Sequence, residues 1–170
     1  IGEPLFSDSP LHTVYLGRTL SYNVSRFYGF SPFYQQAALS SVTLGECVTL
    51  LPQNLFYDCT ALTELSIPGG VSAVGHSAFS GCTALRKLVF KDGTEPLALG
   101  YNHFSQVGGK NLFHDTAVET LYLGRDVQFL SGIEYGGAPF SSLKALRRVE
   151  VGATVTTIPD DLFARCGQLG

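Results

Sequence analysis

The chain has 170 residues, of which 45% are apolar and 15% are charged, and its formal net charge is -3. This composition is too apolar for a disordered chain, yet no apolar run approaches the length of a membrane span, so we expect no direct membrane insertion by this chain. No basic cluster provides the electrostatic footprint that nucleic-acid binding needs.

A recurring sequence motif shows how the chain is organised. CTALTEL begins at Cys59 and CTALRKL begins at Cys82. When the chain is aligned on the apolar residue that follows this phrase, units begin near residues 11, 39, 62, 85, 118 and 146. The shortest units have 23 residues and the longer ones have 28 or 33. This period lies in the leucine-rich-repeat range, and it predicts a solenoid of about six coils that share one core.

Each unit predicts the same elements in the same order. In the unit that spans residues 62–84, Leu65 and Ile67 lie two residues apart, which is typical of a strand with alternate side chains facing inward. Proline or glycine is expected to end that strand in successive units, at Gly45, Pro68, Gly124 and Gly152. A second short apolar pair and a phenylalanine follow. The predicted fold is therefore a leucine-rich-repeat solenoid of the α/β class, rich in β-structure and with only short helical or 3-10 turns.

Two columns of side chains are predicted inside this solenoid. Seven phenylalanines recur at the matching place and should stack opposite the first strand: Phe6, Phe33, Phe56, Phe79, Phe113, Phe140 and Phe163. Cys59, Cys82 and Cys166 share one repeat position, and we interpret them as buried small side chains. Disulfides between them are not expected, because equivalent side chains of stacked coils point in parallel. Cys47 should lie between the two short strands and be more exposed.

The pattern L-x-x-L-x-IP-x-x-V-x-x-IG-x-x-AF-x-x-C-x-x-L resembles the BspA-like leucine-rich repeats. The resemblance covers essentially the whole chain and is close in the units at Leu39, Leu62 and Leu146. The segments LFSDSPL and LFHDTAV are one residue short and lack the cysteine, while two other units carry Gln36 and Leu143 in its place. The resemblance implies a surface-exposed or secreted protein, mainly of bacteria, that serves in adhesion or ligand binding. Its partner would be a host or extracellular protein or a glycan.

No catalytic constellation is visible in the chain. The serines occur in no G-x-S-x-G context, and the glycines fall at turn positions and form no phosphate-binding loop. His103 and His114 lie near Asp115, but their spacing matches no metal-ligand motif. We therefore expect no enzyme activity, no cofactor and no metal site.

Two surfaces are candidates for ligand binding. The first is the outward face of the first strands, with the candidate residues Tyr15, Glu64, Lys87, Val89, Tyr122 and Arg148. The second consists of the segments 21–30, 97–110 and 131–138, which enlarge three units and offer Tyr22, Tyr28, Tyr101, Phe104 and Tyr135. These aromatic side chains would either contact a ligand or fold back over the core that wider coils expose.

The favoured function is therefore that of a binding or adhesion module. The alternative is a structural spacer that displays another domain and has no ligand of its own. Both ends of the chain stop inside a unit, and terminal repeats usually need caps. We accordingly expect residues 1–170 to be one leucine-rich-repeat domain from a longer protein.

Overall fold

The computed structural model describes residues 5–6, 9–22, 31–101, 112–129, 138–141 and 143–170 of the chain. The strands in this part are β1 (Thr13–Arg18), β2 (Ser41–Cys47), β3 (Leu50–Leu51), β4 (Glu64–Ile67), β5 (Ala73–Gly75), β6 (Lys87–Phe90), β7 (Leu97–Tyr101), β8 (Thr120–Leu123), β9 (Val127–Gln128) and β10 (Arg148–Val151).

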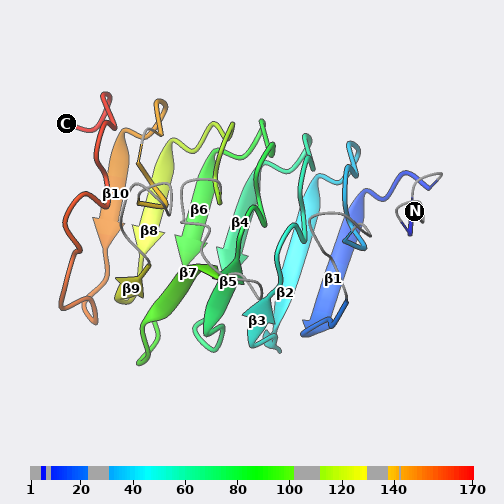
Figure 1. The fold of residues 1–170 in the computed structure, drawn as a ribbon, viewed down its shortest axis with the longest axis horizontal. Helices are drawn as coiled ribbons and strands as arrows, with labels where there is room; N and C mark the ends of the chain where they lie inside the picture. The colour runs from blue at the N-terminus through cyan, green and yellow to red at the C-terminus, as the bar shows by residue number, and fades with distance from the viewer. Residues whose placement is uncertain (1–4, 7–8, 23–30, 102–111, 130–137, 142) are drawn as a thin grey trace.

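The first strands of the six units form one face of the solenoid. In Figure 1, β1, β2, β4, β6, β8 and β10 follow one another in chain order across the molecule. Every ladder between them is parallel, and the register pairs equivalent repeat positions, as with Ser66, Val89 and Tyr122. β2 and β4 are in contact, but no ladder joins them among the described residues. The predicted solenoid is confirmed.

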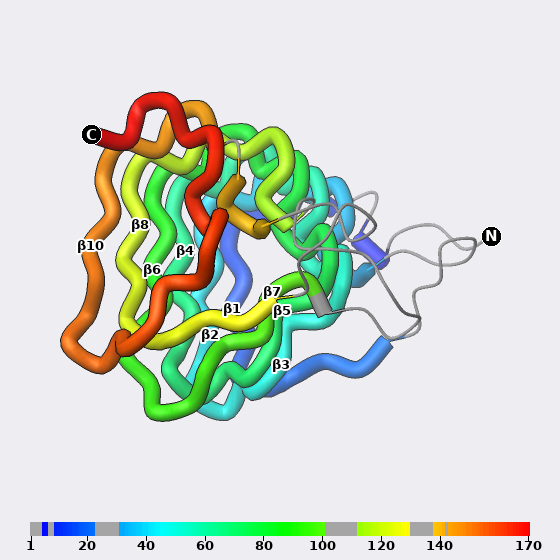
Figure 2. The backbone as a smooth tube through the Cα atoms, turned by 60° about the vertical axis from the view of Figure 1, so that its left-hand side comes forward, coloured from blue at the N-terminus to red at the C-terminus, as the bar shows by residue number. Residues whose placement is uncertain are grey.

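The second short strands form a separate parallel sheet in the order β3-β5-β7-β9. Figure 2 shows these strands on the side of the coils away from β10, β8, β6 and β4. β7 corrects one predicted boundary, because Leu97–Tyr101 is part of the sheet and not an inserted loop. Leu97 and Leu99 are buried there, as Ala73 and Val74 of the paired strand β5 are in the preceding coil.

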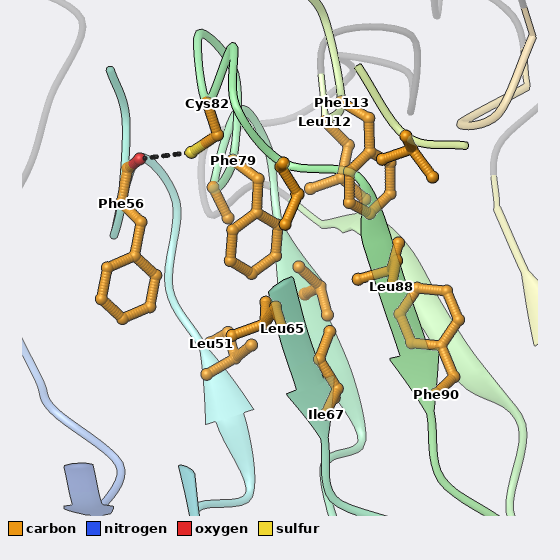
Figure 3. Packing of buried hydrophobic residues seen from close by; sticks show 14 of the residues in the cluster. Leu51, Phe56, Leu65, Ile67, Phe79, Cys82, Leu88, Phe90, Leu112 and Phe113 are labelled. Carbon is orange, nitrogen blue, oxygen red and sulfur yellow. Dashed lines mark hydrogen bonds between the residues drawn. The ribbon is translucent and has the colours of Figure 1, made fainter. Parts of the chain in front are cut away.

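Alternate side chains along the first strands fill the core. In β4, β6 and β8 every second side chain points inward, and these side chains are buried. The buried apolar residues form one continuous cluster from Val14 to Cys166, part of which Figure 3 shows. Glycine does not always end the strand as predicted: β2 continues through Gly45 to Cys47. Gly124 and Gly152, like Pro68, do directly follow the ends of their strands.

The phenylalanine column is confirmed along its whole length. The seven rings stack in chain order with centroids 5.4 to 6.0 Å apart. Residues around each ring form hydrogen-bonded turns, and the described residues contain no helix. Left-handed backbone occurs repeatedly two residues before or after a phenylalanine, at Gln35, Asn54, Asp58, Ser77, Gly81, Asp115, Asp161 and Arg165.

The cysteine column has a specific bonding role. Cys59, Cys82 and Cys166 are buried, and each thiol donates to the backbone carbonyl of the phenylalanine one coil earlier, at 3.1–3.2 Å. Figure 3 shows the bond from Cys82 to Phe56. Gln36 stands at the same position, and its side-chain amide donates to Phe6 O at 3.0 Å. All four cysteines are free, and the exposed Cys47 is the last residue of β2.

One buried arginine joins coils that are not neighbours. Arg125 is only 1% exposed and donates to Gly69 O at 2.7 Å and to Pro68 O at 3.0 Å, two coils earlier in the chain. Gly93 in the intervening coil leaves room for it, because a Cβ there would lie 2.9 Å from Arg125 Cδ. Burial lowers the pKa of Arg125. This side chain therefore connects three successive coils, by hydrogen bonds to the first and by packing beside Gly93 of the second.

Candidate functional site

The structure places all six predicted strand-face residues on the same outward face. One column runs through Tyr15, Thr43, Ser66, Val89, Tyr122 and Glu150, and its neighbour through Thr13, Ser41, Glu64, Lys87, Thr120 and Arg148. Glu64, Lys87 and Arg148 are exposed, while Val89 and Tyr122 are half-buried. Tyr15 is 72% exposed, which makes it the most accessible aromatic side chain that the structure describes.

Two glycines support the Tyr15 ring. A Cβ at Gly17 would lie 3.1 Å from Tyr15 Cε1, and a Cβ at Gly45 of the next coil would lie 2.9 Å from Tyr15 Oη. Neither glycine has a positive φ, so what each contributes here is space beside the ring and not an unusual backbone conformation. The ring therefore lies across the backbone of two coils and presents its surface to solvent.

Tyr122 repeats this arrangement. A Cβ at Gly152, in the next coil, would lie 2.9 Å from Tyr122 Oη and 2.9 Å from the Cα of Gly124. The Tyr122 hydroxyl donates to Asp92 Oδ1 at 2.7 Å, and this bond to a carboxylate raises the pKa of Tyr122. The Tyr122 side chain is thus held at both ends, by the backbone and by the bond from its hydroxyl to Asp92.

Sequence reasoning missed these platforms, although a signal was present. The segments TVYLGR (Thr13–Arg18) and TLYLGR (residues 120–125) are nearly identical, and each precedes a unit with glycine at the matching place. The following residues also act alike. Thr19 Oγ1 accepts from the backbone N–H groups of Thr49 and Leu50 at 2.9 and 3.1 Å.

Asp126 takes the place of Thr19 in the second copy. Its Oδ1 accepts from the backbone N–H groups of Thr156 and Thr157 at 2.7 and 3.0 Å, and Oδ2 accepts from the Thr156 hydroxyl at 2.6 Å. These bonds, first of all the one from the Thr156 hydroxyl, lower the pKa of Asp126. The unit with Tyr15 and the unit with Tyr122 therefore share this hydrogen-bonding arrangement, although Arg18 is exposed where Arg125 is buried.

Charged side chains on this face are largely paired with one another. Glu119 lies between Arg86 and Arg147 and forms an ion pair with each. Hydrogen bonds from Arg147 and then Arg86 lower the pKa of Glu119. Arg148 pairs with Glu150 at 2.6 Å. These pairs involve Arg86, Glu119, Arg147, Arg148 and Glu150, whereas Glu64 and Lys87 on the same face are exposed.

Among the insertion candidates, only the side chain of Tyr22 is in the described part of the chain. It packs against the core, and its hydroxyl donates to Gln53 O at 2.8 Å. Burial raises the pKa of Tyr22. Tyr28, Phe104 and Tyr135 lie outside the described residues, as does the side chain of Tyr101. Tyr22 covers the core and offers little surface to a ligand.

Other kinds of site receive no support from the described residues. No three His, Cys, Asp or Glu side chains there are grouped to hold a metal ion. His114 Nδ1 and Asp115 Oδ2, which the sequence brings together, form an exposed pair at 3.0 Å. No helix in this part of the chain could span a membrane. The burial of Cys59 raises the pKa of its thiol to about 12, so it is a poor nucleophile.

Parallel coils, the phenylalanine column and a face of paired strands define a leucine-rich-repeat solenoid. More specifically, residues 1–107 match the family described as BspA type Leucine rich repeat region (6 copies), and the chain belongs to this family. Leucine-rich-repeat families of this kind provide protein-binding or adhesion modules, are typically non-enzymatic, and often occur on surface or secreted proteins.

A crystal structure of a leucine-rich repeat protein from Eubacterium ventriosum is also similar to this chain. The TM-score is 0.41 at 16% sequence identity, over 84% of this chain. This chain spans 40% of the length of that structure. No curated protein matches the chain.

Proposed function

We propose that this chain is a non-catalytic binding module that engages an extracellular protein or glycan through the face of its first strands. The observation that carries the proposal is Tyr15, a large aromatic side chain that is 72% exposed although the core beneath it is well packed. Exposed aromatic residues on an extended solenoid face are the usual energetic anchors of a binding surface.

The insertion surface is the weaker candidate for the site. Its one described aromatic side chain, Tyr22, is held by Gln53 and packs on the core. A ring that packs on the core would have to leave that packing before its face could contact a ligand, and that would cost free energy. Tyr15 would not have to leave a comparable packed position.

A binding screen against extracellular-matrix proteins and a glycan array tests the proposal. The strand-face variant Tyr15→Ser/Tyr122→Ser and the insertion variant Tyr101→Ser/Phe104→Ser would be compared with the wild type, after urea denaturation shows that both are folded. Loss of binding in the strand-face variant alone is the expected result. Loss in the insertion variant alone would move the site, and a folded wild type that binds nothing would favour the structural spacer.

The family also supports a location on the cell surface or outside a bacterial cell. An antibody against this chain should therefore label intact cells that express the whole protein, or detect the protein in the medium. Labelling only after the cells are permeabilised would contradict this location.

A further inference from the structure

We infer that Tyr15 and Tyr122 are two platforms for the sugar rings of one neutral polysaccharide chain. The inference rests on the proposed function of the strand face and adds the chemical class of the ligand. It starts from the repeated construction, in which each tyrosine lies over a glycine of its own coil or the next. The hydroxyl bond to Asp92 holds the Tyr122 ring before a ligand arrives, so little conformational entropy is lost there on binding. The more exposed Tyr15 ring lies beside Gly17 and Gly45, which leave room for it.

The surroundings of Tyr15 are those of a neutral polar ligand. The outward side chains directly beside Tyr15 on β1 and β2 are Thr13, Ser41 and Thr43, all of which carry a hydroxyl group and no charge. The exposed charges of these strands, Arg18 and Glu46, lie toward their C-terminal ends. A sugar ring has an apolar C–H face that can lie on an aromatic ring and a rim of hydroxyl groups that exchange hydrogen bonds with such neighbours.

The surroundings of Tyr122 carry charges of both signs, and several of them are paired. Asp92 accepts the Tyr122 hydroxyl, and Arg148 pairs with Glu150 on the adjacent strand. Lys87 on β6 is exposed and adds one positive charge near this ring, so the acidic probes in the experiment test whether charge or sugar hydroxyl groups decide binding. Carboxylate and guanidinium groups in fixed positions are, however, good partners for the hydroxyl groups of a neutral sugar.

A peptide is a poorer fit to the same surface. Extended peptides bind by adding a strand at a free sheet edge or by lying in an aromatic-lined groove. Both tyrosines lie on the outward face of strands whose backbone groups are used in the ladders β1–β2, β6–β8 and β8–β10. The backbone beside Tyr122 therefore has little left to offer a peptide, because β8 is paired on both sides. In the described part of the chain β1 is paired with β2 alone, but a peptide strand added at its other edge would not reach Tyr122.

The separation of the platforms calls for a polymer. Four strand-to-strand steps separate β1 from β8, which at ordinary strand spacing is about 19 Å. A single sugar cannot reach both rings, whereas a polysaccharide lying across the strands can. Engaging two sites with one chain raises the apparent affinity by about 10²-fold or more over one site.

Affinity electrophoresis in gels containing mannan, xylan, laminarin or dextran would test the inference, with alginate and heparin as acidic probes. We expect at least one neutral polymer to retard the wild type. Tyr15→Ala and Tyr122→Ala should each weaken this binding by about tenfold or more, and the double variant should lose it. Tyr15→Phe keeps the ring and should bind nearly as well as the wild type.

Two controls separate the platforms from general effects of mutation. Gly45→Ala keeps both tyrosines but places a methyl group 2.9 Å from Tyr15 Oη, so the ring must shift, and polymer binding should weaken by less than in Tyr15→Ala. Tyr57→Ala removes a tyrosine that stacks on Tyr34 at 5.1 Å, away from the strand face, and should leave binding unchanged. Urea denaturation would show that each variant is folded.

Three outcomes would overturn the inference: no retardation by any neutral polymer, retardation by acidic polymers only, or full retardation of the double variant. If no neutral polymer binds but matrix-protein binding is lost in Tyr15→Ser/Tyr122→Ser, the proposed function stands and the sugar class is wrong. If polymer binding persists in that variant and is lost in Tyr101→Ser/Phe104→Ser, both are wrong.

Discussion

Arg125 gives a sharp test of how the coils are held together. Replacing it by alanine removes two charged hydrogen bonds, to Pro68 O and Gly69 O, and the aliphatic stem that packs beside Gly93. A hydrogen bond to a charged group contributes roughly 1.5–3 kcal/mol, and the cost of burying a guanidinium without a counter-ion offsets part of this. We expect Arg125→Ala to lower the free energy of unfolding by about 3 kcal/mol.

Arg18 provides the matched control, because it ends the first TxYLGR segment as Arg125 ends the second, yet it is exposed. Urea denaturation of Arg18→Ala should give a stability within about 0.5 kcal/mol of the wild type. In a thermal scan, Arg125→Ala should melt about 6–12 °C lower, the shift that about 3 kcal/mol produces in a chain of this size. Equal stabilities of wild type and Arg125→Ala, or equal losses in both variants, would refute the role of Arg125.

Three further predictions concern the core, the thiols and the dependence of the free energy of unfolding on pH. Phe79 lies in the middle of the ring column, so Phe79→Ala should lower the free energy of unfolding by about 3–5 kcal/mol in urea denaturation. Phe163 lies at the half-buried end, so Phe163→Ala should lower it by less than half as much. Equal losses would contradict the column as a shared core. Iodoacetamide should label one thiol, the exposed Cys47, in the folded chain and all four after denaturation, as counted by mass spectrometry; a second label on folded protein would show that the cysteine column is open. Because its arginine partners lower the pKa of Glu119 in the folded chain, its contribution to stability is complete above the unfolded pKa and is lost as the pH falls through the folded value. Glu119→Gln should therefore be less stable than the wild type at pH 7, with a difference that shrinks below about pH 4 in denaturation series; a difference independent of pH would rule out the carboxylate charge as its cause.

Most of the fold could be predicted because the period of the sequence is also the period of the structure. Leu65 and Ile67 face inward, and Phe79 joins the ring column, because each is repeated in the coils on either side. The role of Gln36 could not be predicted from its chemistry, since an amide has replaced a thiol. The position nevertheless keeps its function, which is to donate to the carbonyl of the preceding phenylalanine.

The features that escaped prediction depend on contacts that a period does not encode. Glycines such as Gly45 were interpreted as strand ends, whereas Gly45 lies within β2 and leaves space for Tyr15. Arg125 acts across an intervening coil, so comparison of neighbouring units does not reveal it. The near-identity of TVYLGR and TLYLGR is visible in the sequence, but its meaning required the glycines of the following coils.

The spacing of the ring column has a consequence for how such a chain can vary. The units differ in length by up to 10 residues, yet ring centroids remain 5.4 to 6.0 Å apart across short and long units alike. Extra residues are thus accommodated without any change in the stacking that joins coil to coil, and closing a longer loop adds only about 0.6 kcal/mol per doubling. Segments of different length can be exchanged between units while the opposite face keeps its geometry, so one side of the solenoid is free to diversify and the other holds Tyr15 and Tyr122 at a fixed separation.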